Sequence, residues 1–289
     1  MSTNSDIEWC DHTWPLISGC HPRSPGCAKC WAVRMSWRLS HNPVIASDYA
    51  GTVEKVGRSA SGQLIQVQVG HPGRLRWSGR VNMLSHRLNW PMTKKWKPGS
   101  KIFVSDMADL CSPEVTDEFI LDVFRVMLQT PQFIYQLLTK DPDRLVALSP
   151  RIGALVEEYG GSAARWPGHL WFGTSVENPA MYWRIDELRK LPAAIRYISA
   201  EPLLKQLSHI PLQGIHWIIA GCESGPGARL MDEAWVEQLL DDTKQAGGAF
   251  FYKQRLDERG HKVSKPKLGG QSWTEFPLVI DNYSLRGTE

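Results

Sequence analysis

One stretch of the sequence decides the fold: residues 101–140 read KIFVSDMADLCSPEVTDEFILDVFRVMLQTPQFIYQLLTK. The apolar runs over 101–105 and 133–139 have the length and the β-branched and aromatic content of buried strands. Between them, apolar residues recur at helical spacing over 113–128. A strand, a helix and a second strand in this order predict a unit whose two strands run parallel in one sheet.

The same alternation continues after this unit. Pro142 and Pro179 stand where two further helices would begin, a position at which a proline loses no hydrogen bond. Six strands with helices between them predict an α/β fold, an incomplete (β/α) TIM-like barrel. The further strands are predicted over 169–175, 195–200, 215–220 and 249–253, and the further helices over 142–159, 179–191 and 232–246.

Composition bounds the class of protein. The 289 residues are 42% hydrophobic and 22% charged, which is typical of a globular chain with a sizeable core. The N-terminus has no basic stretch before an apolar run, and no run of about 18 apolar residues occurs later. We therefore expect a cytoplasmic protein without membrane association.

The positive charge is concentrated in one region. Residues 51–101 hold ten basic residues and one acid, Glu54, whereas the whole chain has a net charge of only +3. Trp77, Trp90 and Trp96 lie in the same region, and basic residues interleaved with aromatic ones suit phosphate neutralisation and base stacking. The alternative is an ordinary solvated surface.

Three cysteines gather in the segment GCHPRSPGCAKCW, residues 19–31. Cys20, Cys27 and Cys30 have the spacing C-x6-C-x2-C, and a helical pattern follows them. In a chain without a signal peptide, such crowding favours metal ligation over disulfides. A loop of this kind wraps three thiolates around an iron-sulfur cluster, leaving one iron open, while the following helix directs its positive N-terminus toward them.

A zinc site is the competing interpretation of the same cysteines. Structural zinc takes four ligands, so Cys10, His12 or His21 would have to complete the set. Spacing alone leaves both metals open.

Polar residues follow nearly every predicted strand. In a (β/α) barrel, the chemistry lies at the carboxyl ends of the strands. Helix capping alone would explain Asn178 but not the repeated glutamates and lysines, whose charges suit a zwitterionic ligand. The strand-end residues that we single out are Asp106, Lys140, Thr174, Ser175, Glu177, Asn178, Glu201, Cys222, Glu223 and Lys253.

Passages spread over almost the whole chain resemble a group of phage-associated proteins of the radical S-adenosylmethionine (SAM) type. The passages are IEWCDHTW (7–14), GCHPRSPGCAKCWA (19–32), FVSDMADL (103–110), QLLTKDPDRL (136–145), WFGTSVEN (171–178), ISAEPLL (198–204), IIAGCESGPGARLMD (218–232) and FFYKQ (250–254). Together and in this order, they are specific for that group of proteins.

The resemblance implies a radical SAM barrel, with a [4Fe-4S] cluster on Cys20, Cys27 and Cys30 and SAM at the open iron. Reductive cleavage of SAM, with electrons from an external donor, would give a 5′-deoxyadenosyl radical that abstracts a hydrogen atom from the substrate. The residues that we expect to bind the cofactor are Trp31, Asp106, Lys140, Thr174, Ser175, Glu177, Asn178 and Glu201, and those that we expect to be catalytic are Cys222, Glu223 and Lys253.

The regions of the chain then take separate roles. Residues 1–46 form the cluster-binding N-terminal segment of the barrel, and the glycine-punctuated residues 47–82 form a small basic β-hairpin insertion. Residues 83–256 complete the barrel, and 257–289 form a loop-rich tail. Where the family has glycine, this chain has Cys222, either a hydrogen donor to a substrate radical or a small buried side chain.

The basic insertion indicates DNA as the partner. Proteins that look like this one rearrange a glycyl group on the thymine methyl carbon of phage DNA, so the sharpest expectation is isomerisation of a glycyl-modified thymidine during DNA hypermodification. Two alternatives stay open. One is a radical SAM lyase that repairs a damaged base, and the other is a zinc-stabilised nucleic-acid-binding protein.

Overall fold

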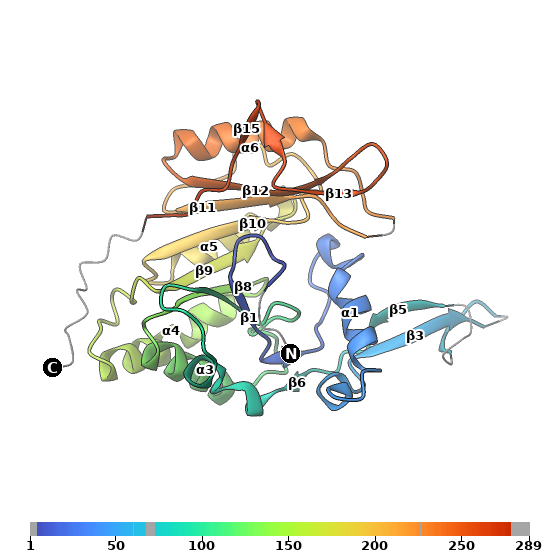
Figure 1. The fold of residues 1–289 in the computed structure, drawn as a ribbon, viewed down its shortest axis with the longest axis horizontal. Helices are drawn as coiled ribbons and strands as arrows, with labels where there is room; N and C mark the ends of the chain where they lie inside the picture. Colours follow the sequence, from blue (N-terminus) through green and yellow to red (C-terminus); the bar gives the residue numbers. More distant parts are fainter. Residues whose placement is uncertain (1–4, 60, 68–72, 226, 279–289) are drawn as a thin grey trace.

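The computed structural model describes residues 5–59, 61–67, 73–225 and 227–278. Its centre is a curled eight-stranded sheet in the order β1-β7-β8-β9-β10-β11-β12-β13 (Figure 1). All neighbouring strands pair in parallel except β12 and β13. The incomplete (β/α) barrel is thereby confirmed. Its strands are His12–Trp14, Lys101–Val104, Ile134–Thr139, Leu170–Ser175, Ile195–Ala200, Trp217–Gly221, Ala249–Leu256 and Lys262–Ser264.

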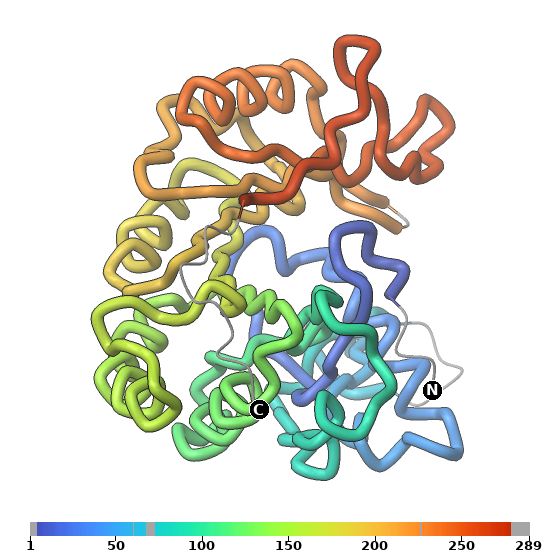
Figure 2. Tube along the Cα trace, turned by 60° about the vertical axis from the view of Figure 1, so that its left-hand side comes forward, coloured from blue at the N-terminus to red at the C-terminus, as the bar shows by residue number. Residues whose placement is uncertain are grey.

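The strand and helix units follow one another around an arc, with the N-terminal part of the chain on its inner side (Figure 2). The connecting helices are α3 (Asp117–Gln129), α4 (Pro142–Glu158), the 3-10 turn η4 (Pro179–Met181) with α5 (Trp183–Arg189), and α6 (Glu233–Gln245). They form where apolar residues recur at helical spacing.

Two helices differ from their predicted bounds. The first begins at Asp117 rather than at residue 113, because Thr116 caps it by accepting a hydrogen bond from the Phe119 amide at 3.3 Å. The helix predicted over 179–191 is divided, since a 3-10 turn at Pro179–Met181 precedes α5.

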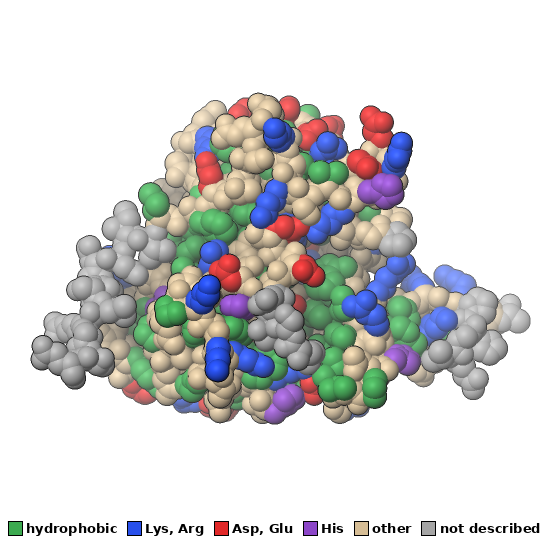
Figure 3. Space-filling view, viewed as in Figure 1, with side chains coloured by type: hydrophobic (Ala, Val, Ile, Leu, Met, Phe, Trp, Pro, Cys, Tyr) green, Lys and Arg blue, Asp and Glu red, His purple; other side chains and the backbone are tan. Residues whose placement is uncertain are grey.

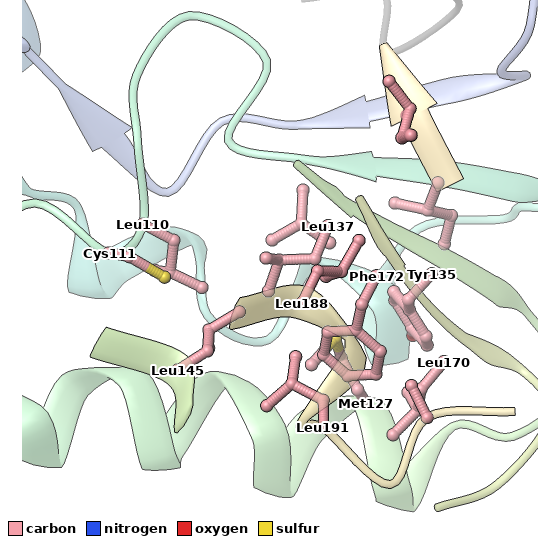
Figure 4. Packing of buried hydrophobic residues seen from close by; sticks show 14 of the residues in the cluster. Leu110, Cys111, Met127, Tyr135, Leu137, Leu145, Leu170, Phe172, Leu188 and Leu191 are labelled. Carbon is pink, nitrogen blue, oxygen red and sulfur yellow. The ribbon is translucent and has the colours of Figure 1, made fainter. Parts of the chain in front are cut away.

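The main core lies between the sheet and the outer helices. Figure 4 shows residues of this core, which come from several strands and helices. Phe124 on α3 stacks on Phe172 on β9, with ring centroids 6.0 Å apart, and Cys111 is fully buried among the same residues. Removing an aromatic side chain of this kind costs about 3–5 kcal/mol.

Aromatic residues fill the inner side of the sheet at its amino end. Trp9 packs on Phe103 with ring centroids 4.6 Å apart, and Trp217 packs on Phe276 at 5.2 Å. Gly173 provides the space for this cluster, since a Cβ there would lie 2.3 Å from the ring of Tyr197. The interior is therefore closed at the amino end of the strands, and open space lies at their carboxyl end.

The insertion is a three-stranded antiparallel sheet, so the predicted hairpin is confirmed and gains a strand. β3 (Val53–Arg58) pairs with β4 (Leu64–Gln66) on one side and with β5 (Arg74–Trp77) on the other. This sheet contacts α1 (Trp31–Leu39), the helix predicted after the cysteines (Figure 1). Residues 60 and 68–72 of the insertion lie outside the described residues.

Short elements complete the chain. The described part of the predicted tail adds β13 to the main sheet and forms a separate hairpin, whereas residues 279–289 lie outside the described part. None of the described helices has the length and apolar character needed to span a bilayer. The remaining elements are β2 (Ile17–Ser18), β6 (Asn82–Met83), β14 (Lys267–Leu268), β15 (Gln271–Ser272), α2 (Trp90–Thr93) and the 3-10 turns η1 (Pro25–Cys27), η2 (Ala46–Tyr49) and η3 (Ser85–Arg87).

Candidate functional site

A cavity of about 590 Å³ opens at the carboxyl ends of the parallel strands. Successive residues of a strand point to opposite faces of the sheet, so within β9 Ser175 reaches this cavity and Thr174 does not. The wall includes the ends of β8 to β12, the segment before β1 and one side of α1. The predicted residues that line it are Cys30, Trp31, Asp106, Lys140, Ser175, Glu201, Cys222, Glu223 and Lys253.

Three predicted cofactor residues lie elsewhere. The Thr174 hydroxyl donates a hydrogen bond to the Thr139 carbonyl oxygen at 2.8 Å, on the face of β9 away from the cavity. Asn178 caps η4 by accepting from the Ala180 amide at 3.0 Å, and Glu177 is completely buried. The geometry gives these residues structural contacts rather than a place on the cavity wall.

The cysteine loop, residues 19–31, lines one side of the cavity through Gly26, Lys29 and Cys30. Cys27 ends η1, and Cys30 is the N-cap residue of α1, whose N-terminus lies next to it. Burial raises the pKa of the Cys30 thiol. Burial alone would raise the pKa of Cys27, but the Lys140 ammonium, 3.5 Å from its sulfur, and hydrogen bonds from Arg23 and Ser24 lower it. The loop therefore already stabilises one thiolate.

A network of buried ion pairs holds the cysteine loop in place. Glu177 pairs with Lys140 at 2.7 Å and with Arg184 of α5 at 3.2 Å. Its Oε1 also accepts a hydrogen bond from the Ser24 hydroxyl. Lys140 in turn contacts both Ser24 and Cys27. One carboxylate thus links the ends of β8 and β9 to the cysteine loop.

We expect Gly26→Ala to displace the cysteine loop. A Cβ at this buried position would lie 2.5 Å from Glu177 Oε1, and Glu177 is held by Lys140 and Arg184. The expected result is a loss of at least half of the iron retained per chain, measured after anaerobic reconstitution and desalting. Ala28→Ser is the control, because it adds one atom at an exposed position of the same loop. Full iron retention in Gly26→Ala would show that the contact with Glu177 does not position the loop.

The loop that follows β11 also contacts the cysteine loop. Arg229 pairs with Glu223 and donates from Nη2 to the Pro25 carbonyl oxygen at 3.0 Å. The Lys29 ammonium donates to the Gly227 carbonyl oxygen. Burial acts to raise the pKa of Glu223, but its bonds to Arg229 hold that pKa below the usual value. Glu223 therefore lines the cavity as an ion-paired carboxylate.

The part of the cavity wall at the ends of β10, β11 and β12 is polar. Lys253 pairs with Glu201 at 2.9 Å, and the Ser199 hydroxyl donates to Glu201 at 3.2 Å. Burial raises the pKa of the neighbouring Cys222 thiol to about 11, so this group keeps its hydrogen at neutral pH. We call this wall, formed by Ser199, Glu201, Cys222 and Lys253, the polar lobe of the cavity.

The three thiols of the cysteine loop have the chemistry of iron-sulfur cluster ligands. Within the described ranges, no three His, Cys, Asp or Glu side chains are arranged to hold one metal ion. A four-iron cluster places each thiolate on a different iron atom, so its ligands need not converge on one point. The thiols of Cys20, Cys27 and Cys30 still lie close enough to act on one another electrostatically.

The proposed fourth zinc ligands have other contacts. The Cys10 thiol donates to the Ser5 hydroxyl at 3.1 Å within the aromatic cluster. His12 stacks on Trp96 with ring centroids 4.9 Å apart, and His21 pairs with Glu114 at 3.1 Å. Each of these three side chains is engaged in a contact with a residue outside the cysteine loop.

The basic region has one exposed face. The register of the small sheet places Arg58, Arg74 and Arg76 on the same side, opposite the side on which Trp77 packs against α1. Figure 3 shows Lys and Arg side chains over α1 and the neighbouring insertion. Arg76 also pairs with Glu54 at 2.7 Å. We call Arg58, Arg74 and Arg76 the basic face.

Three residues of the predicted basic and aromatic set lie inside the protein instead. Arg87 is 1% exposed and pairs with Asp48, whereas Trp77 and Trp96 belong to hydrophobic clusters. The prediction that these three residues contact phosphates or bases is wrong, because side chains buried in this way cannot reach a polynucleotide.

A partial (β/α) barrel with a three-cysteine loop at its mouth defines the class of this protein. Within that class, the chain belongs to the family described as a protein of unknown function (DUF5131), which matches residues 4–277. No curated protein and no solved structure matches the chain. The barrel, the insertion and the cysteine loop all fall within the region that matches the family.

Proposed function

We propose that this protein is a radical SAM enzyme that modifies a nucleobase in DNA. The observation that carries the proposal is that Cys20, Cys27 and Cys30 lie in one loop, of which Gly26, Lys29 and Cys30 line the barrel cavity. Cys30 and Lys140 line that cavity, and Lys140 contacts Cys27, so a group held by this loop would face the space in which a substrate binds.

The three cysteines would hold a [4Fe-4S] cluster, and SAM would bind beside it. When bound, these groups supply a 5′-deoxyadenosyl radical that removes a hydrogen atom from the substrate. Lys140 provides a positive charge next to the anionic thiolates. Glu201 and Lys253 present one negative and one positive group in the polar lobe, which suits the ammonium and carboxylate of the methionine part of SAM.

The substrate that we favour is DNA bearing a glycyl-modified thymidine, with isomerisation as the reaction. The basic face supports a polynucleotide substrate, since arginines neutralise phosphates. Mass spectrometry of nucleosides released from treated DNA tests the reaction. An isomerase leaves the mass of the modified nucleoside unchanged and shifts its retention time, whereas a lyase or repair enzyme changes the mass.

Cys222 and Lys253 stay our proposed catalytic groups, because both line the cavity within the polar lobe. The protonated Cys222 thiol has a hydrogen atom that a substrate radical can take, and one electron from the external donor with one proton would return the resulting thiyl radical to the thiol. Glu223 orients the wall next to Cys222 through its ion pair with Arg229.

We expect charge reversal on the basic face to weaken DNA binding. The double variant Arg58→Glu with Arg74→Glu removes two exposed cations, so the slope of log K against log salt should fall by about 2, at roughly 0.9 per phosphate contact. Fluorescence anisotropy of a labelled duplex at several salt concentrations measures this slope. The control is Arg151→Glu with Lys190→Glu, which makes the same charge change on α4 and next to α5. Equal slopes for both double variants would show that the basic face does not contact DNA.

A further inference from the structure

One side of the cavity differs from the polar lobe. Trp31, Met35 and Leu39 recur at every fourth residue of α1, so they form one stripe on that helix, and all three line the cavity. Met35 and Leu39 pack against a hydrophobic cluster that contains Tyr49 and Met107, and both of these also line the cavity. We call Trp31, Met35, Leu39, Tyr49 and Met107 the aromatic lobe.

Trp31 marks the outer end of this lobe. Its side chain is 43% exposed although it lines the cavity, so one part of the indole is accessible from outside. Arg34 and Arg38 lie on the exposed surface of the same helix, and the helix contacts the insertion that bears the basic face. Exposed positive charge therefore lies on the same helix as Trp31.

Asp106 is the acid beside the aromatic lobe. It directly precedes Met107 and lines the cavity, and its Oδ1 is buried without a hydrogen-bond partner among the described residues. Burial raises the pKa of Asp106 to about 7. Arg87, whose charge acts to lower the pKa of Asp106, is already engaged by Asp48 and the Pro15 carbonyl oxygen. A buried oxygen without a partner is costly, which indicates that a ligand completes its hydrogen bonding.

We propose that the aromatic lobe receives the base that is modified, flipped out of the DNA, with Trp31 stacking on its face and Asp106 accepting a hydrogen bond from its Watson–Crick edge. This inference rests on the proposed function, since it names the place of the substrate within the same cavity. Stacking on an aromatic side chain is a common way to hold an extruded base, and a carboxylate oxygen is a suitable acceptor for the N3–H of thymine.

The base of the substrate fits this lobe better than the adenine of SAM. A base attached to a polymer must enter from the mouth, and Trp31 is the exposed end of the lobe. Arg34 and Arg38 lie on the exposed surface of the helix that carries Trp31, where the phosphates of the polymer would run. The charged groups for the methionine part of SAM lie on the other wall, at Glu201 and Lys253.

The first test measures binding of the full chain to three single-stranded oligonucleotides that differ at one central position. This position carries thymine, N3-methylthymine or no base. We expect the wild type to bind the thymine strand at least about fivefold more tightly than the abasic strand, the lower end of the effect of one stacked base. Trp31→Ala should abolish this preference and Trp31→Phe should keep it. Trp183→Ala is the matched control, because Trp183 is 44% exposed and lies on α5 away from the cavity.

The second test concerns Asp106. N3-methylthymine lacks the N3–H, so the wild type should bind it more weakly than thymine, and Asp106→Ala should lose this discrimination while it keeps the preference over the abasic strand. Equal binding of all three strands by the wild type would overturn the inference. So would a Trp31→Ala variant that keeps its base preference but loses affinity for SAM in a calorimetric titration.

These outcomes are separable from failure of the proposed function. A protein that forms 5′-deoxyadenosine but shows no base preference contradicts only the assignment of the aromatic lobe. A protein that forms no 5′-deoxyadenosine contradicts the radical mechanism itself.

Discussion

Cys27→Ala is expected to abolish both cluster binding and formation of 5′-deoxyadenosine. Cys27 is the thiol whose pKa the surroundings lower, through Lys140 and through hydrogen bonds from Arg23 and Ser24. A thiolate is the form that ligates metal, so this position is the best prepared of the three. Iron should fall from about four atoms per chain to less than one. Iron and sulfide analysis after anaerobic reconstitution, with chromatography of the SAM products, measures both effects.

Cys10→Ala is the control for this variant. Cys10 is also near the N-terminus, but its thiol bonds to Ser5 inside the aromatic cluster. We expect Cys10→Ala to retain the iron content of the wild type. A Cys27→Ala protein with full iron would show that the ligands are misassigned, and loss of metal from Cys10→Ala would favour a four-ligand zinc site.

Glu177→Gln is expected to destabilise the fold and to release the cysteine loop. Glu177 is completely buried and Arg184 is 1% exposed, so the substitution leaves a buried guanidinium without its carboxylate. Breaking one side of such a pair costs about 3–5 kcal/mol. Urea unfolding of the cluster-free protein, followed by circular dichroism, measures the free energy of unfolding.

The matched substitution is Glu118→Gln on the protein surface. Glu118 pairs with Arg151, but the two side chains are 69% and 47% exposed. Pairs of this kind contribute about 0–1 kcal/mol, so this variant should unfold almost as the wild type does. If Glu177→Gln were as stable as Glu118→Gln, the buried network could not be what fixes the loop.

Most of the barrel is predictable from sequence because its strands are buried on both faces. Runs such as IRYISA (195–200) and AFFYK (249–253) carry strand composition that local reasoning detects. β1 (His12–Trp14) is not predicted, since three residues are too few to show a period. It joins the sheet through its partner β7, a contact far apart in sequence.

The candidate site was less predictable because strand ends carry side chains on both faces. Ser175 lines the cavity and Thr174 does not, a difference that follows from the two-residue period of β9. The two-residue period of a strand therefore predicts that only one of these two side chains faces the cavity. Glu177 was expected in the cofactor site, but its partners Lys140 and Arg184 come from β8 and α5. Only the packed fold brings those charges together.

Some contributors to the site gave no chemical signal in the sequence. Gly26 matters for the space that it leaves beside Glu177, and Arg229 for the bridge that it makes to the cysteine loop. Trp9 lines the cavity from a segment that precedes the first strand. Such roles depend on distances between separate segments, which local patterns do not encode.

The central claim is that Cys20, Cys27 and Cys30 hold a four-iron cluster with one iron open to SAM. Electron paramagnetic resonance of the anaerobically reconstituted and reduced protein, recorded with and without SAM, tests it most directly. We predict the signal of a reduced [4Fe-4S] cluster and a change in that signal when SAM is added. A colourless protein with one zinc per chain and no such signal would contradict the claim.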